Sequence, residues 1–470
     1  MNRLSLVLLG GLALGAGGCT LEPRYRRPAA PVPTQWPATG GETAATPAAP
    51  ATAAWRDFVT DPKIRQVVAL ALQNNRDLRT AALNVELARA TYGIQRDLLF
   101  PSVTAQGNGG KQRASAELTE AGRPRTTESY SASLGVLAWE VDFFGRVRSL
   151  NREAWQKYQA TEEARRSAQT LLVSNVVAAY LSLAADHDAL ALAERTLQTQ
   201  QATYDLVRRQ FDAGIATALE LHQAQTPLET ARASRAQSTR AVAQAENALN
   251  LLAGTTVPAD LQPAGLAAID AFREVAAGLP STVLLGRPDV LQAEHALQAA
   301  NADIGAARAA FFPRISLTGT LGSGSRELSG LFEGGTGTWS FLPSATMPIF
   351  DARTWTAHRA AKVQRELAVA QYEKAVQSAF REVADALATR ATIGEQLAAQ
   401  ERLVEALAET DRLATARYER GVDSYLVALD AQRSLFAARQ GLVSLRLAAL
   451  TSRVQLYAAL GGGAEPEPRH

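Results

Sequence analysis

Few residues in this chain have the types and the spacing that chemistry requires. The clearest group is Leu426, Asp430 and Arg433, which lie at i, i+4 and i+7 and so share one face of a helix. They follow a turn at Gly421, and Tyr418 precedes that turn. Taken alone, Asp430 and Arg433 are a solvated pair worth about a few tenths of a kcal/mol.

Other titratable residues do not form an enzyme site in the sequence. Glu140 and Asp142 lie two apart at a strand end and could mimic a catalytic pair, but they are better explained by a structural role at that end. No G-x-S-x-G, H-E-x-x-H or phosphate-loop motif is present. The histidines are scattered without metal-ligand spacing: His187, His222, His295, His358 and His470. We therefore expect no catalysis, no metal and no cofactor, and the net charge of +2 gives no reason to expect nucleic acid.

The single cysteine has a different explanation. Cys19 follows a positive Arg3, an apolar run from Leu4 to Ala16 and two glycines, which is the pattern of a cleaved signal. The apolar run is shorter than the roughly 20 residues of a membrane-spanning helix, and no other stretch is long and apolar enough to span a membrane as a helix. This end resembles the lipobox of bacterial lipoproteins, although Ala16 stands where that pattern prefers Leu. The resemblance implies a covalent lipid on Cys19. The alternative is an ordinary secretory signal.

The chain is a tandem duplication. A helix that ends at Phe312-Pro313 and leads into an alternating strand is repeated earlier, where a helix ends at Phe100-Pro101. We predict a signal peptide (1–18), an extended tether (19–61), a first repeat (62–254), a linker (255–280), a second repeat (281–461) and a tail (462–470). In each repeat the sequence predicts a helix, two strands and a long helical hairpin.

The strands and helices have distinct signatures. One strand follows Pro101, a polar loop is expected at 111–128, and the next strand runs from Ser129 to Val141. The second repeat is expected to have a strand after Pro313, a Gly-rich loop at 322–338 and a strand to Phe350. Between Arg146 and Ala213 there is neither Gly nor Pro, and apolar residues recur at the seven-residue period of coiled coils: Val176, Leu183, Leu190, Leu197, Tyr204 and Phe211.

Four such strands cannot close a barrel alone. Lipid tolerates no open sheet edge, and single-chain bacterial barrels begin at about eight strands. The chain must therefore share a barrel with copies of itself, while its long helices project into water.

Four segments carry a family resemblance: RPDVLQAEHALQAANADIGAARAAFFPRISLTG, ALQNNRDLRTAALNVELARATYGIQRDLLFPSV, WEVDFFGRVR and YERGVDSYLVALDAQRSLF. They resemble the hallmark segments of TolC/OprM-type outer membrane factors of the lipoprotein (NodT-like) branch, over Trp55 to Gly461. The resemblance implies a mixed α/β membrane protein, in which a homotrimer forms a twelve-stranded outer-membrane β-barrel continued by a periplasmic α-helical barrel. It implies a lipid-anchored exit duct in a Gram-negative outer membrane, which expels small molecules such as drugs. The implied partners are a periplasmic adaptor and an inner-membrane transporter of the resistance-nodulation-division class.

The same resemblance assigns roles to residues of the hairpins. It places Gly214, Thr217, Gly421 and Ser424 at periplasmic tips that contact the adaptor. Residues of similar type and place in the family form the aperture, so it implies a periplasmic gate made of Tyr418, Leu426, Asp430 and Arg433. The first repeat has Phe211, Leu219, Gln223 and Thr226 at the equivalent places, so a ring of charge would come from the second hairpin only.

Two alternatives remain open at this stage. The duct could serve another transporter class, for secretion or metal export. A lipid-anchored coiled-coil scaffold without a pore would require the four alternating segments to be something other than barrel strands.

Overall fold

The computed structural model describes residues 20–36, 54–120, 122–269, 272–273 and 280–462. The chain divides into two compact units. One contains Asn84–Thr161, Gln292–Tyr372 and the described residues up to Ala29. The other contains the described parts of Ala30–Leu83, Glu162–Leu291 and Glu373–His470. The predicted signal peptide, with Cys19, and most of the predicted tail lie outside the described residues.

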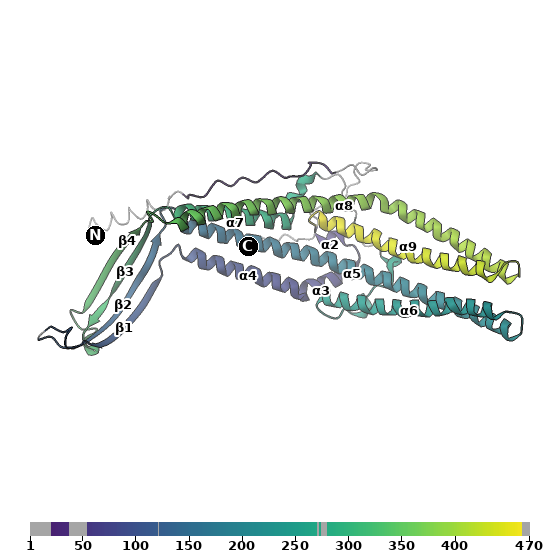
Figure 1. Ribbon diagram of the computed structural model, residues 1–470, viewed down its shortest axis with the longest axis horizontal. Coiled ribbons are helices and arrows are strands. Elements are labelled where there is room, and N and C mark those ends of the chain that lie inside the picture. The colour runs from purple at the N-terminus through teal and green to yellow at the C-terminus, as the bar shows by residue number, and fades with distance from the viewer. Residues whose placement is uncertain (1–19, 37–53, 121, 270–271, 274–279, 463–470) are drawn as a thin grey trace. The chain divides into compact units, whose positions relative to one another are not determined.

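The first unit holds one antiparallel sheet in the order β1-β2-β3-β4 (Figure 1). The strands are β1 (Val103–Arg113), β2 (Thr126–Val141), β3 (Arg314–Ser325) and β4 (Gly337–Thr346). Each repeat supplies one hairpin, and β2 pairs with β3 between the repeats. Within this chain, β1 and β4 are therefore edge strands. Pro101 and Pro313 lie between each preceding helix and its strand, as the break pattern predicts.

The strands extend further into glycine and polar sequence than predicted. The predicted loops 111–128 and 322–338 shrink to residues 114–125 and 326–336, and β4 ends at Thr346 rather than Phe350. Glycine in a strand often marks a close backbone approach, and that holds here. A Cβ on Gly322, which the sequence assigned to a loop, would lie 2.7 Å from the Ser133 Cα on the neighbouring strand. Gly-rich sequence was therefore wrongly assigned to loops.

A β-bulge interrupts the alternation of β2. Val136 pairs with Gly319 but Trp139 pairs with Leu317, so β2 has one extra residue there. Ala138 has φ of 52° and its amide donates to the Thr318 hydroxyl at 3.0 Å. The register thus places Trp139, not Ala138, on the same face of the sheet as Val136. The prediction that this strand alternates strictly between its two faces is therefore wrong at the bulge.

The first predicted helix is in fact two. α3 (Pro62–Asn74) and α4 (Arg76–Asp97) are separated by Asn75, which has an extended backbone. The Asn75 side chain accepts from the Leu78 amide at 2.9 Å and donates to the Leu252 carbonyl at 3.0 Å. It thereby caps α4 and connects it to the end of α6 (Ala218–Ala253). The periodicity of the sequence could not predict this break, because the break depends on a contact with a residue distant in the chain.

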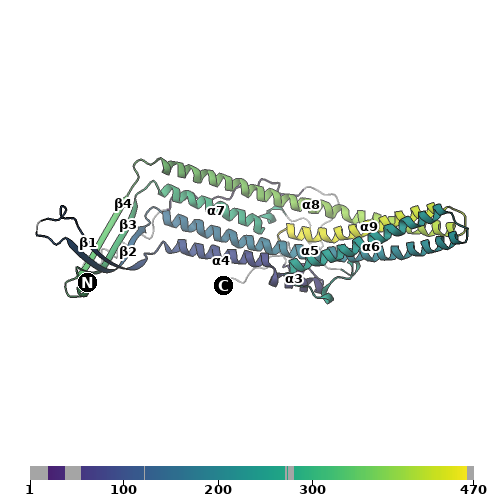
Figure 2. The ribbon, with the colours of Figure 1, turned by 60° about the horizontal axis from the view of Figure 1, so that its bottom comes forward.

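The long helices agree with the prediction. α5 (Arg146–Asp212) and α6 (Ala218–Ala253) form one hairpin, and α8 (Ala352–Glu419) and α9 (Tyr425–Ala459) form the other. Figure 2 shows their two turns at the same end. The remaining helices of the described residues are α7 (Pro288–Ala309), α2 (Trp55–Phe58) and the short 3-10 helices η2 (Ala259–Leu261), η3 (Leu266–Ala268), η4 (Ser281–Gly286) and η5 (Leu328–Gly330).

The buried stripe of α5 changes position along the helix. Val176 and Leu183 are fully buried, as the seven-residue pattern predicts. Nearer the turn, Ala193, Gln200 and Val207 are buried instead of Leu197, Tyr204 and Phe211. These three residues are also seven apart, so the period persists while its phase shifts. The predicted seven-residue period is therefore confirmed, but in this half of the helix the buried residues are not the ones that the sequence selected.

α5 is also the one described helix that is long and apolar enough to cross a membrane by composition, with a mean hydropathy of 1.5 over its most apolar window. The prediction that no stretch after the signal would pass this test was therefore wrong. However, 56% of that window is buried within the protein, as in the core helices of soluble proteins.

The predicted tether is packed against the protein in its described parts. In the first unit, Tyr25 and Arg27 both bond the nearly buried Glu294 carboxylate on α7, with Arg27 bidentate at 2.8 and 2.6 Å. In the second unit, Trp55 and Phe58 of α2 are buried, and Phe58 stacks on Tyr457 with ring centroids 4.0 Å apart. The prediction of an extended segment to residue 61 was thus wrong at α2.

Candidate functional site

The two hairpin turns have the same backbone design. Gly214 and Gly421 have φ of 75° and 71°, the left-handed conformation that glycine adopts without strain. The residue after each glycine donates a backbone hydrogen bond to the carbonyl five residues earlier. The Ile215 amide donates to the Gln210 carbonyl, and the Val422 amide donates to the Arg417 carbonyl. Both helices therefore end in a Schellman motif. The predicted tip residues Gly214, Thr217, Gly421 and Ser424 are all exposed at these turns.

The return helices begin differently. In the first hairpin, Thr217 and Glu220 form a complete capping box, and the bonds from Thr217 lower the pKa of the Glu220 carboxyl. In the second hairpin, the N-cap Ser424 makes no side-chain cap bond. Instead, Arg417 holds Asp423 through two contacts of 2.5 and 2.9 Å across the turn, which lowers the pKa of that carboxyl. The second turn thus depends on an exposed ion pair.

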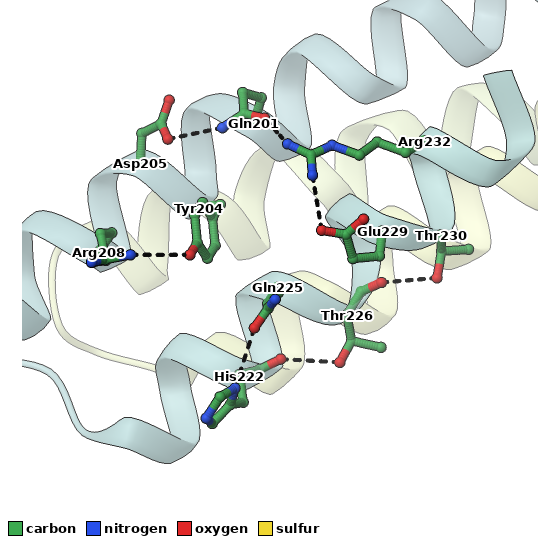
Figure 3. A network of polar contacts seen from close by, with 10 residues as sticks. All are labelled: Gln201, Tyr204, Asp205, Arg208, His222, Gln225, Thr226, Glu229, Thr230 and Arg232. Carbon is green, nitrogen blue, oxygen red and sulfur yellow. Dashed lines mark hydrogen bonds and ion pairs between the residues drawn. The ribbon is translucent and has the colours of Figure 1, made fainter. Parts of the chain in front are cut away.

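Polar contacts connect the two helices of the first hairpin (Figure 3). Arg232 on α6 donates to Gln201 on α5 at 3.0 Å and to Glu229 at 2.9 Å. Gln201 in turn donates to Asp205 at 2.9 Å. The Thr226 hydroxyl donates to the His222 carbonyl of its own helix at 3.0 Å. This surface of the first hairpin is therefore already bonded within the chain.

An aromatic seam packs the second hairpin against the first. We define the seam as Tyr425 and Leu429 of α9 with Val207 of α5 and Ala224 of α6, all buried. Tyr418 packs against it, its ring 5.3 Å from that of Tyr425. The Tyr425 side chain is only 3% exposed, and burial raises its pKa to about 12. Its hydroxyl has no hydrogen-bond partner in the described part of the chain.

One polar bond accompanies the seam. Gln200 of α5, 6% exposed, donates to Gln432 of α9 at 2.9 Å. On the side toward α8, Ala428 and Ala431 pack against Ala414. α9 therefore has two covered sides near its start, one toward the first hairpin and one toward α8.

The remaining side of α9 is uncovered, and it holds three predicted gate residues. Leu426 is 58% exposed, and Asp430 and Arg433 are exposed. Neither Asp430 nor Arg433 forms an ion pair with any described residue, including each other. The i, i+3 pair expected from the sequence alone is therefore not formed. Tyr418, the fourth predicted residue, is half-buried against the seam instead.

The equivalent face of the first hairpin has no charge. Phe211 and Leu219 are exposed there, with Gln223 and Thr226 in place of Asp430 and Arg433. The sequence missed Tyr425, Gln200 and Gln432. The signal that could have found them is the second seven-residue series, Ala193, Gln200 and Val207. It was missed because a glutamine at a buried position interrupts the apolar pattern by which heptads are recognised.

The carboxylates that could mimic a catalytic pair are engaged elsewhere. Glu140 forms ion pairs of 2.6 Å with both Arg146 and Arg314, and Asp142 accepts from the Arg148 amide at 2.8 Å. These contacts hold the junction between strands and helices. Among the described residues, no group of three His, Cys, Asp or Glu side chains could hold a metal ion.

Comparisons with known proteins agree with this architecture. The sequence matches the family described as "Outer membrane efflux protein" over residues 67–255 and 279–462. It is 50% identical over 464 residues to the toluene efflux pump outer membrane protein TtgC of Pseudomonas putida, covering 98% of this chain and 96% of that one. It is 44% identical over 454 residues to the outer membrane protein OprJ of Pseudomonas aeruginosa, covering 96% and 94%. The open state of the MtrE outer membrane channel of Neisseria gonorrhoeae matches with a TM-score of 0.84 and 38% identity, covering 95% of this chain and 99% of that one.

The seam predicts opposite effects of two substitutions at Tyr425. Tyr425→Phe removes a buried hydroxyl without a partner, so we expect it to be neutral or to stabilise the protein by about 1 kcal/mol. Tyr425→Ala leaves a cavity and should cost about 3 kcal/mol. Hydrogen exchange of peptides spanning 418–432 should then be faster in Tyr425→Ala and unchanged in the exposed control Val427→Ala. Equal exchange in Tyr425→Ala and the parent would contradict a role for the seam in holding the hairpins together.

Proposed function

The chain belongs to the outer membrane efflux protein family, and we propose on that premise that it is the exit duct of an efflux pump built from several proteins. As a family member it is an outer-membrane efflux channel that carries small molecules outward. Its relatives bear the names toluene, solvent and antibiotic efflux pump outer membrane proteins. We therefore propose drugs and small apolar toxic compounds as cargo. The proposal assigns the chain no catalytic step, and no cofactor beyond a lipid.

The observation that carries the proposal is the four-stranded sheet with two edge strands. Every residue of β1 is exposed, as is nearly every residue of β4. Since hydrocarbon supplies no partners for edge amides and carbonyls, β4 of one copy must pair with β1 of another. Three copies would close a twelve-stranded barrel, which is the homotrimer we propose. The same sheet argues against a coiled-coil scaffold without a pore.

The proposed partners follow from the exposed hairpin turns. Gly214 and Thr217 of the first turn, with Gly421 and Ser424 of the second, are free to contact a periplasmic adaptor. We propose that the adaptor joins the duct to an inner-membrane transporter of the resistance-nodulation-division class. A transporter for secretion or metal export is the alternative.

We propose that Leu426, Asp430 and Arg433 form the periplasmic gate, with Tyr418 behind them. Support comes from the uncovered side of α9, where these three side chains have no partner among the described residues of their own chain. If three copies bring this side to a common axis, the Asp430 carboxylates approach one another and Arg433 can supply the opposing charge. Leu426 can exclude water beside them.

The gate can be tested against the first hairpin as a matched control. We expect Asp430→Ala combined with Tyr418→Phe to raise single-channel conductance in planar bilayers severalfold, because it removes the charged ring and a polar group behind it. Leu426→Ser should admit large antibiotics to cells that lack the pump. Gln223→Ala and Leu219→Ser, at the equivalent positions of the first hairpin, should change neither property. If the two sets of variants behave alike, the aperture is not formed by the second hairpin.

Lipidation of Cys19 is a separate proposal that rests on its position after the apolar run. The mature chain should begin at Cys19 and have the added mass of a lipid, measured on its N-terminal peptide. Cys19→Ala with a functional signal should weaken anchoring but leave assembly intact, because the barrel has its own membrane affinity. An unmodified mature N-terminus would overturn the proposal.

A further inference from the structure

A pocket of about 270 Å³ lies in the second unit, between α2, α8 and α9. Its apolar wall contains Phe58 and Leu456, both buried, together with Ile393 and Leu397. Phe58 is fixed in place by stacking on Tyr457. The apolar part of the pocket is therefore preformed.

The rim of this pocket is cationic. Arg273, Arg390 and Arg453 all line it, and none of its described lining residues is acidic. Among the described residues, the guanidinium groups of Arg273 and Arg453 have no carboxylate partner. By contrast, Arg287 of this unit is paired with Asp289 at 2.7 Å. Two unpaired guanidinium groups beside an apolar wall favour an anion with an apolar body.

The coiled-coil register shows where a carboxylate is missing. Arg446 on α9 pairs with Glu401 on α8 at 3.0 Å. In an antiparallel pair of helices, moving seven residues forward on α9 corresponds to moving seven back on α8. That step leads from Arg446 to Arg453 and from Glu401 to Gly394. Where the first pair has a glutamate, the second therefore has no side chain.

Gly394 keeps the pocket open. It lies within the 68-residue helix α8, where glycine costs roughly 0.5–1 kcal/mol relative to alanine. Neither packing nor a left-handed backbone requires it, since a Cβ at Gly394 would meet nothing within 4 Å. A side chain at this position would instead occupy the pocket that Gly394 lines.

We propose that this pocket binds a small amphipathic carboxylate, an acid group on a short aromatic or aliphatic body. The carboxylate lies between Arg273 and Arg453, in the place of the missing glutamate, and its apolar body packs against Phe58 and Leu456. Guanidinium groups suit a carboxylate because their planar donors match its two oxygens. The pocket offers no cluster of hydroxyl donors for a phosphate, since the Ser452 hydroxyl already donates to the Ala449 carbonyl.

Binding should be measured on the full purified assembly with 3-phenylpropionate, which is too short to form micelles, and with its neutral amide 3-phenylpropanamide. Calorimetry should detect the acid and not the amide, and the bound acid should raise the melting temperature. Arg453→Gln should weaken binding about tenfold, the value of one charge-assisted hydrogen bond. Gly394→Leu should abolish binding by filling the pocket.

Arg446→Gln is the matched control, because its guanidinium pairs with Glu401 one heptad away and should leave the affinity unchanged. Retained channel conductance will show that each variant is folded. The proposal fails if the acid does not bind, if the amide binds equally well, or if neither Arg453→Gln nor Gly394→Leu weakens binding. Binding of phenyl phosphate in preference to the acid would also contradict the assignment of a carboxylate.

Discussion

The structure depends on one constraint, the need of every backbone amide and carbonyl in hydrocarbon for a partner. The described residues of one chain supply four strands, and the outer edges of β1 and β4 have no partner among them. Copies of the chain must meet edge to edge, and this symmetry brings the helical hairpins of several copies around one axis. In the proposed gate, the uncovered side of α9, with Asp430 and Arg433, acquires its partners from the other copies.

Duplication produced two hairpins with the same turn and different chemistry. In both, the first helix ends in a Schellman motif at a glycine, so the two turns share one backbone design. The first hairpin adds a capping box and a polar network, whereas the second has an exposed ion pair between Arg417 and Asp423. Tyr425 connects the two through buried apolar contacts. Any separation of the second hairpin from the first therefore has to withdraw Tyr425 from Val207 and Ala224.

The sequence predicted the fold class, the duplication and the long helices, because local apolar periodicity and the positions of glycine and proline determine those features. It could not predict the break at Asn75, which depends on the Leu252 carbonyl, nor the bulge at Ala138, which depends on Thr318 of a neighbouring strand. At the tip it identified Leu426, Asp430 and Arg433 as one face. It missed the seam, because the burial of Tyr425 depends on the other hairpin. Where tertiary contacts decide a position, local pattern does not reveal it.

One chain cannot close its own barrel, and the mass of the intact, conducting channel tests this most directly. The channel would be released from lipid nanodiscs and weighed by native mass spectrometry. We expect a single species of three chains that separates into single chains only when the sheet is unfolded. A folded single chain that still conducts across a bilayer would show that the barrel is not shared.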